Sequence, residues 1–254
     1  MGRKLIFLYG VISYFVFFTT FLYMIGFVGG IFVPKGINSG VAASVSKALF
    51  INLFFILLFG IQHTIMARIK FKNWFTKLIP KPMERSTYVL LASLILIALV
   101  WQWRPMNRVI WSVGNPIGNT FLWILFFSGW IMVLYSTFII NHFDLFGLRQ
   151  VYFYLKGKEY TPVPLVVKSF YHFCRHPIML GFIIAFWATP FMTLGHLVFA
   201  IMTTLYILFG IHVEERTLMK ILGDQYRHYR QQVSMIFPIP KFPKQKSSEK
   251  ALSH

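Results

Sequence analysis

The chain of 254 residues is 57% hydrophobic and 13% charged, with a mean hydropathy of +0.63 and a formal net charge of +18. A soluble domain of this length carries roughly a quarter charged residues. Because the apolar residues form blocks rather than amphipathic stripes, the composition indicates an integral membrane protein. The single cysteine excludes an intrachain disulfide and a thiolate-based zinc cluster, and no glycine-rich nucleotide loop is present.

The apolar blocks predict an all-α, polytopic membrane protein with crossings at about 5–28, 48–66, 87–103, 120–141, 178–194 and 196–212. The first block is far longer than the apolar core of a signal peptide, which has about 7–15 residues, so we expect it to remain as a helix. The last two blocks are short and meet at Gly195, which predicts a C-terminal helical hairpin. If that hairpin is re-entrant, five transmembrane helices remain instead of six. Residues 1–240 are expected to form one domain and 241–254 a basic, flexible tail.

The basic residues are distributed unevenly between the two sides of this topology. With the N-terminus in the cytoplasm, 21 of the 25 lysines and arginines lie on the cytoplasmic side, and four lie opposite: Lys35, Lys47, Arg104 and Arg108. The positive-inside rule therefore predicts a multi-pass protein of the inner, cytoplasmic membrane with both termini in the cytoplasm. The net charge then reflects topology and attraction to anionic membrane lipid. Nucleic-acid binding is not indicated, because no basic face with base-reading groups is visible outside the membrane.

Most other ionisable residues fall on the same side. All seven acidic residues and seven of the eight histidines are predicted to be cytoplasmic, and only His196 lies opposite. Helix ends commonly carry polar residues, and that alternative stays open. It accounts less well for the adjacent Glu214 and Glu215, because ionisable groups near membrane depth are costly and tend to mark function. The pattern favours a shared polar pocket at the cytoplasmic face.

Several segments resemble known membrane methyltransferases. Arg175-His176-Pro177 with Gly181, followed by Glu214-Glu215 and then by Tyr226, Tyr229 and Pro238, resembles the cofactor region of the isoprenylcysteine carboxyl methyltransferases and the phospholipid N-methyltransferases. With the segments 62–68, 84–88 and 141–151, the chain resembles the nurim family, in its bacterial methanethiol S-methyltransferase branch, from about Phe59 to Pro238. The chain departs from the wider pattern at Met179, where a tyrosine is common.

The resemblance implies an enzyme that methylates methanethiol to dimethyl sulfide with S-adenosylmethionine, bound in a pocket formed by the C-terminal hairpin at the cytoplasmic face. The two glutamates suit the amino group, the ribose hydroxyls or the sulfonium charge of the cofactor, and an arginine suits its carboxylate. The cofactor-binding residues implied are His172, Arg175, His176, Pro177, Gly181, Glu214, Glu215, Tyr226 and Tyr229.

The acceptor must lose a proton, because the thiolate is the nucleophile and a cysteine thiol has a pKa of about 8.5. His63 and His142 are candidate bases, and Arg85 or Arg149 could stabilise the thiolate. No metal is expected. Structural roles stay open for several of these residues: Arg175 could be an ordinary cytoplasmic arginine, His142 could cap a helix, and a glutamate could pair with a nearby arginine.

Two other functions stay open. A lipid or isoprenylcysteine methyltransferase would need a lateral opening wide enough for a long chain. A nurim-like structural membrane protein without catalysis would lack a closed cofactor pocket and would not bind S-adenosylmethionine. The pattern predicts no particular oligomeric state.

Overall fold

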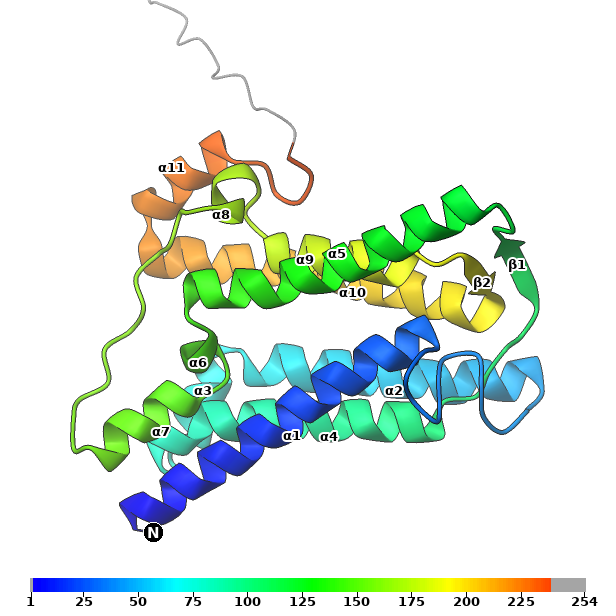
Figure 1. The fold of residues 1–254 in the computed structure, drawn as a ribbon. Coiled ribbons are helices and arrows are strands. Elements are labelled where there is room, and N and C mark those ends of the chain that lie inside the picture. Colours follow the sequence, from blue (N-terminus) through cyan, green and yellow to red (C-terminus); the bar gives the residue numbers. More distant parts are fainter. Residues whose placement is uncertain (1, 239–254) are drawn as a thin grey trace, which may run out of the picture.

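Five long apolar helices dominate the computed structural model of the chain, which describes residues 2–238 (Figure 1). By length and composition, all five can cross a membrane. They are α1 (Arg3–Gly29), α2 (Val45–Met66), α4 (Glu84–Gln102), α5 (Pro116–Ile140) and α10 (Leu194–Leu222). The prediction of an all-α membrane protein is therefore confirmed. The predicted tail at 241–254 lies outside the described residues.

The remaining elements are short. The helical ones are α3 (Ile69–Phe75), η1 (Lys81–Met83), α6 (His142–Leu145), α7 (Leu148–Leu155), α8 (Phe170–Phe173), α9 (Pro177–Trp187) and α11 (Asp224–Gln232). Two strands, β1 (Val109–Ser112) and β2 (Phe191–Thr193), pair in antiparallel fashion. In Figure 1, α3, α6, α7, α8 and α11 gather at one end of the bundle and the two strands lie at the other.

The long helices form two layers, which Figure 1 shows one above the other. Helices α1, α2 and α4 pack together in one layer, and α5, α9 and α10 form the other. Helix α5 lies directly on α9 at Gly129 and Gly181, where a Cβ on Gly181 would lie 2.7 Å from the Gly129 carbonyl oxygen. Small residues allow such backbone contact between membrane helices. Gly181 therefore has a packing role in this structure.

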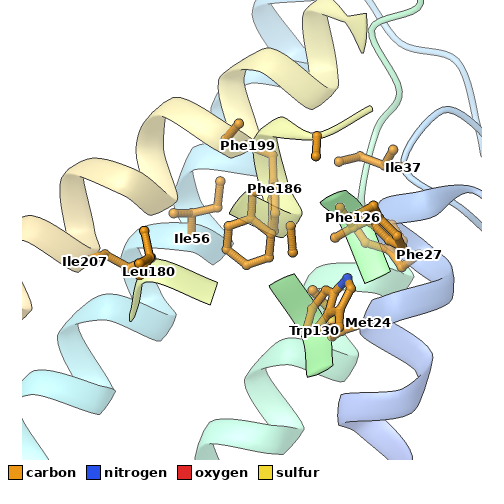
Figure 2. Packing of buried hydrophobic residues seen from close by; sticks show 14 of the residues in the cluster. Met24, Phe27, Ile37, Ile56, Phe126, Trp130, Leu180, Phe186, Phe199 and Ile207 are labelled. Carbon is orange, nitrogen blue, oxygen red and sulfur yellow. The ribbon is translucent and has the colours of Figure 1, made fainter. Parts of the chain in front are cut away.

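One core joins the two layers. Figure 2 shows its side chains, which include Met24 and Phe27 from α1 and Phe126 and Trp130 from α5. Helices α9 and α10 add Phe186 and Phe199, whose rings lie edge to face with centroids 5.0 Å apart. Aromatic pairs prefer such edge-to-face contacts.

The turn between α9 and α10 differs from the predicted hairpin at Gly195. Helix α9 ends at Trp187, because a residue before a proline disfavours helical backbone and Pro190 follows closely. The chain then runs through β2, and α10 begins at Leu194, where the Thr193 hydroxyl accepts a hydrogen bond from the His196 N–H. Gly195 lies in the first turn of α10 and not between two helices.

The segment through α9 traverses the bundle although α9 itself is short. His176, just before α9, lies 3.2 Å from Glu215, and Thr193 immediately precedes α10. The segment from His176 to Thr193 therefore spans the same distance as α10 does from Leu194 to Glu215, about 32 Å at ~1.5 Å per residue. This distance is close to the ~30 Å thickness of the hydrocarbon core of a bilayer. Between residues 2 and 238 the chain thus passes through the bundle six times, five of them as long helices. Helix α10 also continues past the predicted end at 212, so Glu215 lies within the helix.

Candidate active site

Glu215 is the centre of a buried polar cluster on α10. Its Oε1 atom lies 2.6 Å from Arg175 Nη2, 2.7 Å from Arg175 Nε and 3.2 Å from His176 Nε2. The Tyr226 hydroxyl donates to the same oxygen at 3.3 Å, and Arg230 Nε lies 3.3 Å from Oε2. Glu215, Arg175 and His176 are each only 6% exposed. A buried carboxylate of this kind is stable only while its partners remain in place.

Backbone pairing holds Arg175 and His176 in this cluster. Their N–H groups donate to the carbonyls of Ser234 and Met235, at 2.9 and 3.2 Å, so the segment after α11 lies beside the segment before α9. Pro177 occupies the first turn of α9, where its missing N–H removes no helical hydrogen bond. The side chains of Arg175 and His176 are thus placed next to α10 by the start of α9 at Pro177 and by backbone pairing with the segment after α11.

Arg175 uses all three of its guanidinium nitrogens within the protein. Nε and Nη2 donate to Glu215, and Nη1 donates to the backbone carbonyls of Val233 and Arg230. This geometry ties α10, α11 and the C-terminal segment to the start of α9. The two-point contact of Arg175 with the cofactor carboxylate stays a prediction, and the contacts favour a positioning role.

Tyr226 and Tyr229 complete the cluster from α11. Tyr226 is bound to Glu215, and the Tyr229 hydroxyl donates to the Tyr171 carbonyl at 2.5 Å. Burial raises the pKa of Tyr229 to about 12 and also raises the pKa of Tyr226. Both side chains therefore remain protonated hydrogen-bond donors at neutral pH.

Glu214 has a different environment from its neighbour. Its side chain is half exposed, and His176 Nδ1, at 3.6 Å from Oε2, is the partner found among the described residues. Its charge acts electrostatically on Tyr88, Tyr171 and Tyr226, which come from α4, α8 and α11. Glu214 is thus a carboxylate with spare hydrogen-bonding capacity close to several elements.

A second polar cluster, formed by His63 and Tyr88, joins α2 and α4. His63 Nε2 lies 2.7 Å from the Tyr88 hydroxyl, and the imidazole stacks on Phe59 with ring centroids 5.1 Å apart. His63 Nδ1 is buried and has no hydrogen-bond partner within residues 2–238. Arg85 lies over the Tyr88 ring at 5.0 Å and donates Nε to the Leu145 carbonyl at 2.7 Å. His63 therefore has one ring nitrogen engaged and the other available.

His142 has both ring nitrogens engaged. Nδ1 lies 2.8 Å from the Thr137 hydroxyl and Nε2 lies 2.9 Å from the Tyr14 hydroxyl. The residue is 2% exposed, and burial lowers the pKa of its imidazole. Proton transfer to His142 would require one of these bonds to break. Its contacts favour a role in holding α1, α5 and α6 together, and its assignment as a base stays a prediction.

Arg149 holds the loop between α7 and α8. Its guanidinium pairs with Asp144 at 3.0 Å and donates to the Thr161 carbonyl and hydroxyl at 2.8 and 3.1 Å. The Tyr160 hydroxyl donates to the other Asp144 oxygen at 3.2 Å. These contacts favour a structural role over thiolate stabilisation, which for Arg149 also stays a prediction.

The structure brings some predicted residues together and separates others. Arg175, His176, Glu215 and the two α11 tyrosines form one cluster, whereas His172 is exposed at the end of α8. Across the described residues, no group of three or more His, Cys, Asp or Glu side chains is arranged to hold a metal ion. Cys174 is buried, and burial raises the pKa of its thiol, which disfavours the thiolate.

Sequence reasoning missed the partners that complete these groups. Tyr14 and Tyr206 lie far along the chain from the histidines they contact, and no local spacing indicates them. Arg230 could have been found, because it follows Tyr226 by four residues and therefore lies on the same face of α11.

Relatives of the chain match it over nearly its whole length. It is 53% identical over 240 residues to the methanethiol S-methyltransferase of Mycobacterium tuberculosis, covering 94% of this chain and 98% of that one. It is 55% identical over 232 residues to methanethiol S-methyltransferase 1 of Bradyrhizobium diazoefficiens, covering 91% and 81%. A more distant relative is nurim of Bos taurus, 26% identical over 208 residues, covering 76% and 78%. No family model and no solved structure matches the chain.

Proposed function

The chain belongs to the family of the methanethiol S-methyltransferases, and we propose on that basis that it transfers a methyl group from S-adenosylmethionine to methanethiol, giving dimethyl sulfide. The observation that carries this proposal is the cluster of Arg175, His176 and Glu215. The cluster lies where the resemblance assigns the cofactor, and it is held from four elements. We also propose that residues 1–240 act as one domain, because a single core takes side chains from both layers.

The residues present fit S-adenosylmethionine, which supplies an electrophilic methyl group on a cationic sulfur. Glu214 offers a half-exposed carboxylate that can take an ammonium or face a sulfonium. His176 and Tyr226 lie near Glu214 and are further candidates for polar contacts with the cofactor. His172, which is exposed on α8, is another. Glu215 and Arg175 already satisfy each other, so we assign them to positioning the start of α9 rather than to direct contact.

His63 is the proposed base. Its Nε2–H donates to the Tyr88 oxygen in the tautomer that leaves the lone pair of Nδ1 free. The proton of the acceptor thiol would pass to Nδ1. The thiolate sulfur would then bond to the methyl carbon as the bond from that carbon to the cationic sulfur of the donor breaks, so that the donor leaves as a neutral thioether. The Phe59 ring, stacked on the imidazole, keeps water away from this side of the base. Arg85, over Tyr88, adds positive charge nearby.

A direct test is to supply methanethiol to cells that make the protein and to analyse the gas above the culture. We expect dimethyl sulfide well above the level of cells with an empty vector. Purified protein should also bind S-adenosylhomocysteine saturably. Binding together with methylation of a lipid or a prenylcysteine, and no dimethyl sulfide, would favour the lipid alternative. Absence of both binding and methyl transfer in folded protein would favour the structural alternative.

We propose that the site faces the cytoplasm and that both termini lie there, in the inner membrane. The 21-to-4 distribution of basic residues supports this orientation. Arg85 and Arg149 lie in the first turns of α4 and α7, at the end of the bundle where α10 ends, whereas Arg104 and Arg108 precede β1 at the other end (Figure 1). A fluorescent reporter that folds only in the cytoplasm should be bright when fused after His254. If this fusion is dark, and a reporter that is active only in the opposite compartment works at the same position, the C-terminus lies outside the cytoplasm and the proposed orientation is wrong.

A further inference from the structure

Helices α2 and α10 meet at Gly60 and Tyr206. Gly60 is buried, and a Cβ at this position would lie 3.0 Å from Cδ2 and 3.1 Å from Cε2 of the Tyr206 ring. The Tyr206 hydroxyl lies 3.4 Å from the hydroxyl of Thr64, one turn further along α2. A single tyrosine ring therefore covers a full turn of the neighbouring helix.

This contact borders His63. Tyr206 meets the His63 imidazole edge to face with ring centroids 6.5 Å apart, and meets Phe59 in the same way at 5.9 Å. Phe59 itself stacks on His63. The two aromatic rings thus form adjoining walls on the α10 side of His63.

The residues flanking this contact face outward. Leu57 and Ile61 on α2 are 52% and 56% exposed, and Leu205 and Phe209 on α10 are each 56% exposed. In helices that cross a membrane, such apolar side chains contact lipid. Tyr206 therefore stands between the lipid-facing surface of the α2–α10 seam and the imidazole of His63.

We propose that Tyr206 closes this seam and limits the acceptor to short apolar thiols. The inference rests on the proposed function, with His63 as the group that meets the thiol. A longer alkyl chain whose sulfur reached His63 from this side would need the volume that the Tyr206 ring fills. Gly60 allows that ring to lie flat against α2, so the seam is closed without displacing either helix.

The test compares methyl transfer to methanethiol and to 1-hexanethiol in membranes that contain wild type, Tyr206→Ala or Tyr206→Phe. We expect Tyr206→Ala to raise the ratio of kcat/KM for hexanethiol over methanethiol by at least about tenfold, since pocket contacts of a few methylene groups discriminate on this scale. Tyr206→Phe should leave the ratio unchanged, because it keeps the ring and removes only the contact with Thr64. The methyl sulfides formed are measured by gas chromatography.

Phe209→Ala is the matched control, because it truncates an exposed aromatic residue one turn along the same helix. Its ratio should equal that of wild type. An unchanged ratio in an active Tyr206→Ala variant would overturn the proposal, as would an equal rise in Phe209→Ala. If Tyr206→Ala does not accumulate in membranes, Tyr206→Leu should raise the hexanethiol-to-methanethiol ratio by an intermediate amount. A wild-type ratio in Tyr206→Leu would contradict the proposed role of Tyr206 equally. If the wild-type protein methylates neither thiol, the proposed function itself is contradicted.

Discussion

Replacing Glu215 with alanine should destabilise the protein by about 3–5 kcal/mol and abolish binding of S-adenosylhomocysteine. The substitution leaves the Arg175 guanidinium buried without its carboxylate, and loss of one partner of a buried ion pair has this magnitude. It also removes the acceptor of Tyr226 and the partner of His176, so the start of α9 loses its attachment to α10. Thermal unfolding in detergent, combined with ligand titration, measures both effects.

Glu214→Ala is the internal control, because it removes the same chemical group from the adjacent residue. Since Glu214 is half exposed, its loss should change stability by no more than about 0.5 kcal/mol. If Glu214 contacts the cofactor, binding of S-adenosylmethionine should nevertheless weaken by at least ~1.4 kcal/mol, a tenfold loss. If Glu214→Ala binds S-adenosylmethionine with wild-type affinity, Glu214 does not contact the cofactor. A Glu215→Ala protein that unfolds at the wild-type temperature would contradict the stabilising role of the cluster.

The apolar blocks predicted the long helices well, because a helix that can cross a bilayer is recognisable from its length and its apolar composition. Helices α1, α2, α4 and α5 begin and end within a few residues of the predicted crossings. The turn before α10 lies ahead of the predicted Gly195, because Pro190 disfavours helical backbone before it and the Thr193 hydroxyl caps α10. The pairing of β1 with β2 could not be foreseen, since it joins segments about eighty residues apart that are only four and three residues long.

The sequence indicated which charged residues gather, but not how they pair. The resemblance implies cofactor contacts for both Arg175 and Glu215, and the structure pairs them with each other, in line with the open alternative that a glutamate pairs with a nearby arginine. The Val233 carbonyl that also binds Arg175 is a backbone group, which no residue type reveals. Similarly, His63 and His142 look equivalent as candidate bases. They differ only through contacts such as that of Tyr14, which lies 128 residues before His142.

His63→Ala should slow methyl transfer by about 10²–10⁴-fold while leaving the affinity for S-adenosylhomocysteine within about twofold of wild type. The reason is that Nδ1 of His63 is buried and has no partner in the described part of the chain, whereas the proposed cofactor contacts come from α8 to α11. The defect should shrink as the pH rises toward the pKa of the thiol, because free thiolate then replaces the missing base. Initial rates of dimethyl sulfide formation across pH, at saturating methyl donor, measure this.

Two further variants separate catalysis from structure. Tyr88→Phe removes the oxygen that accepts the Nε2–H of His63, so the rate should fall less than in His63→Ala and with the same dependence on pH. His142→Ala should lower the unfolding temperature without this dependence, because it breaks the contacts with Thr137 and Tyr14. A defect in His63→Ala that stays constant with pH would identify structural damage instead of a lost base. If His63→Ala instead makes dimethyl sulfide at the wild-type rate, electrostatic stabilisation of the thiolate by Arg85 is the better account, and Arg85→Gln should carry the larger loss of rate.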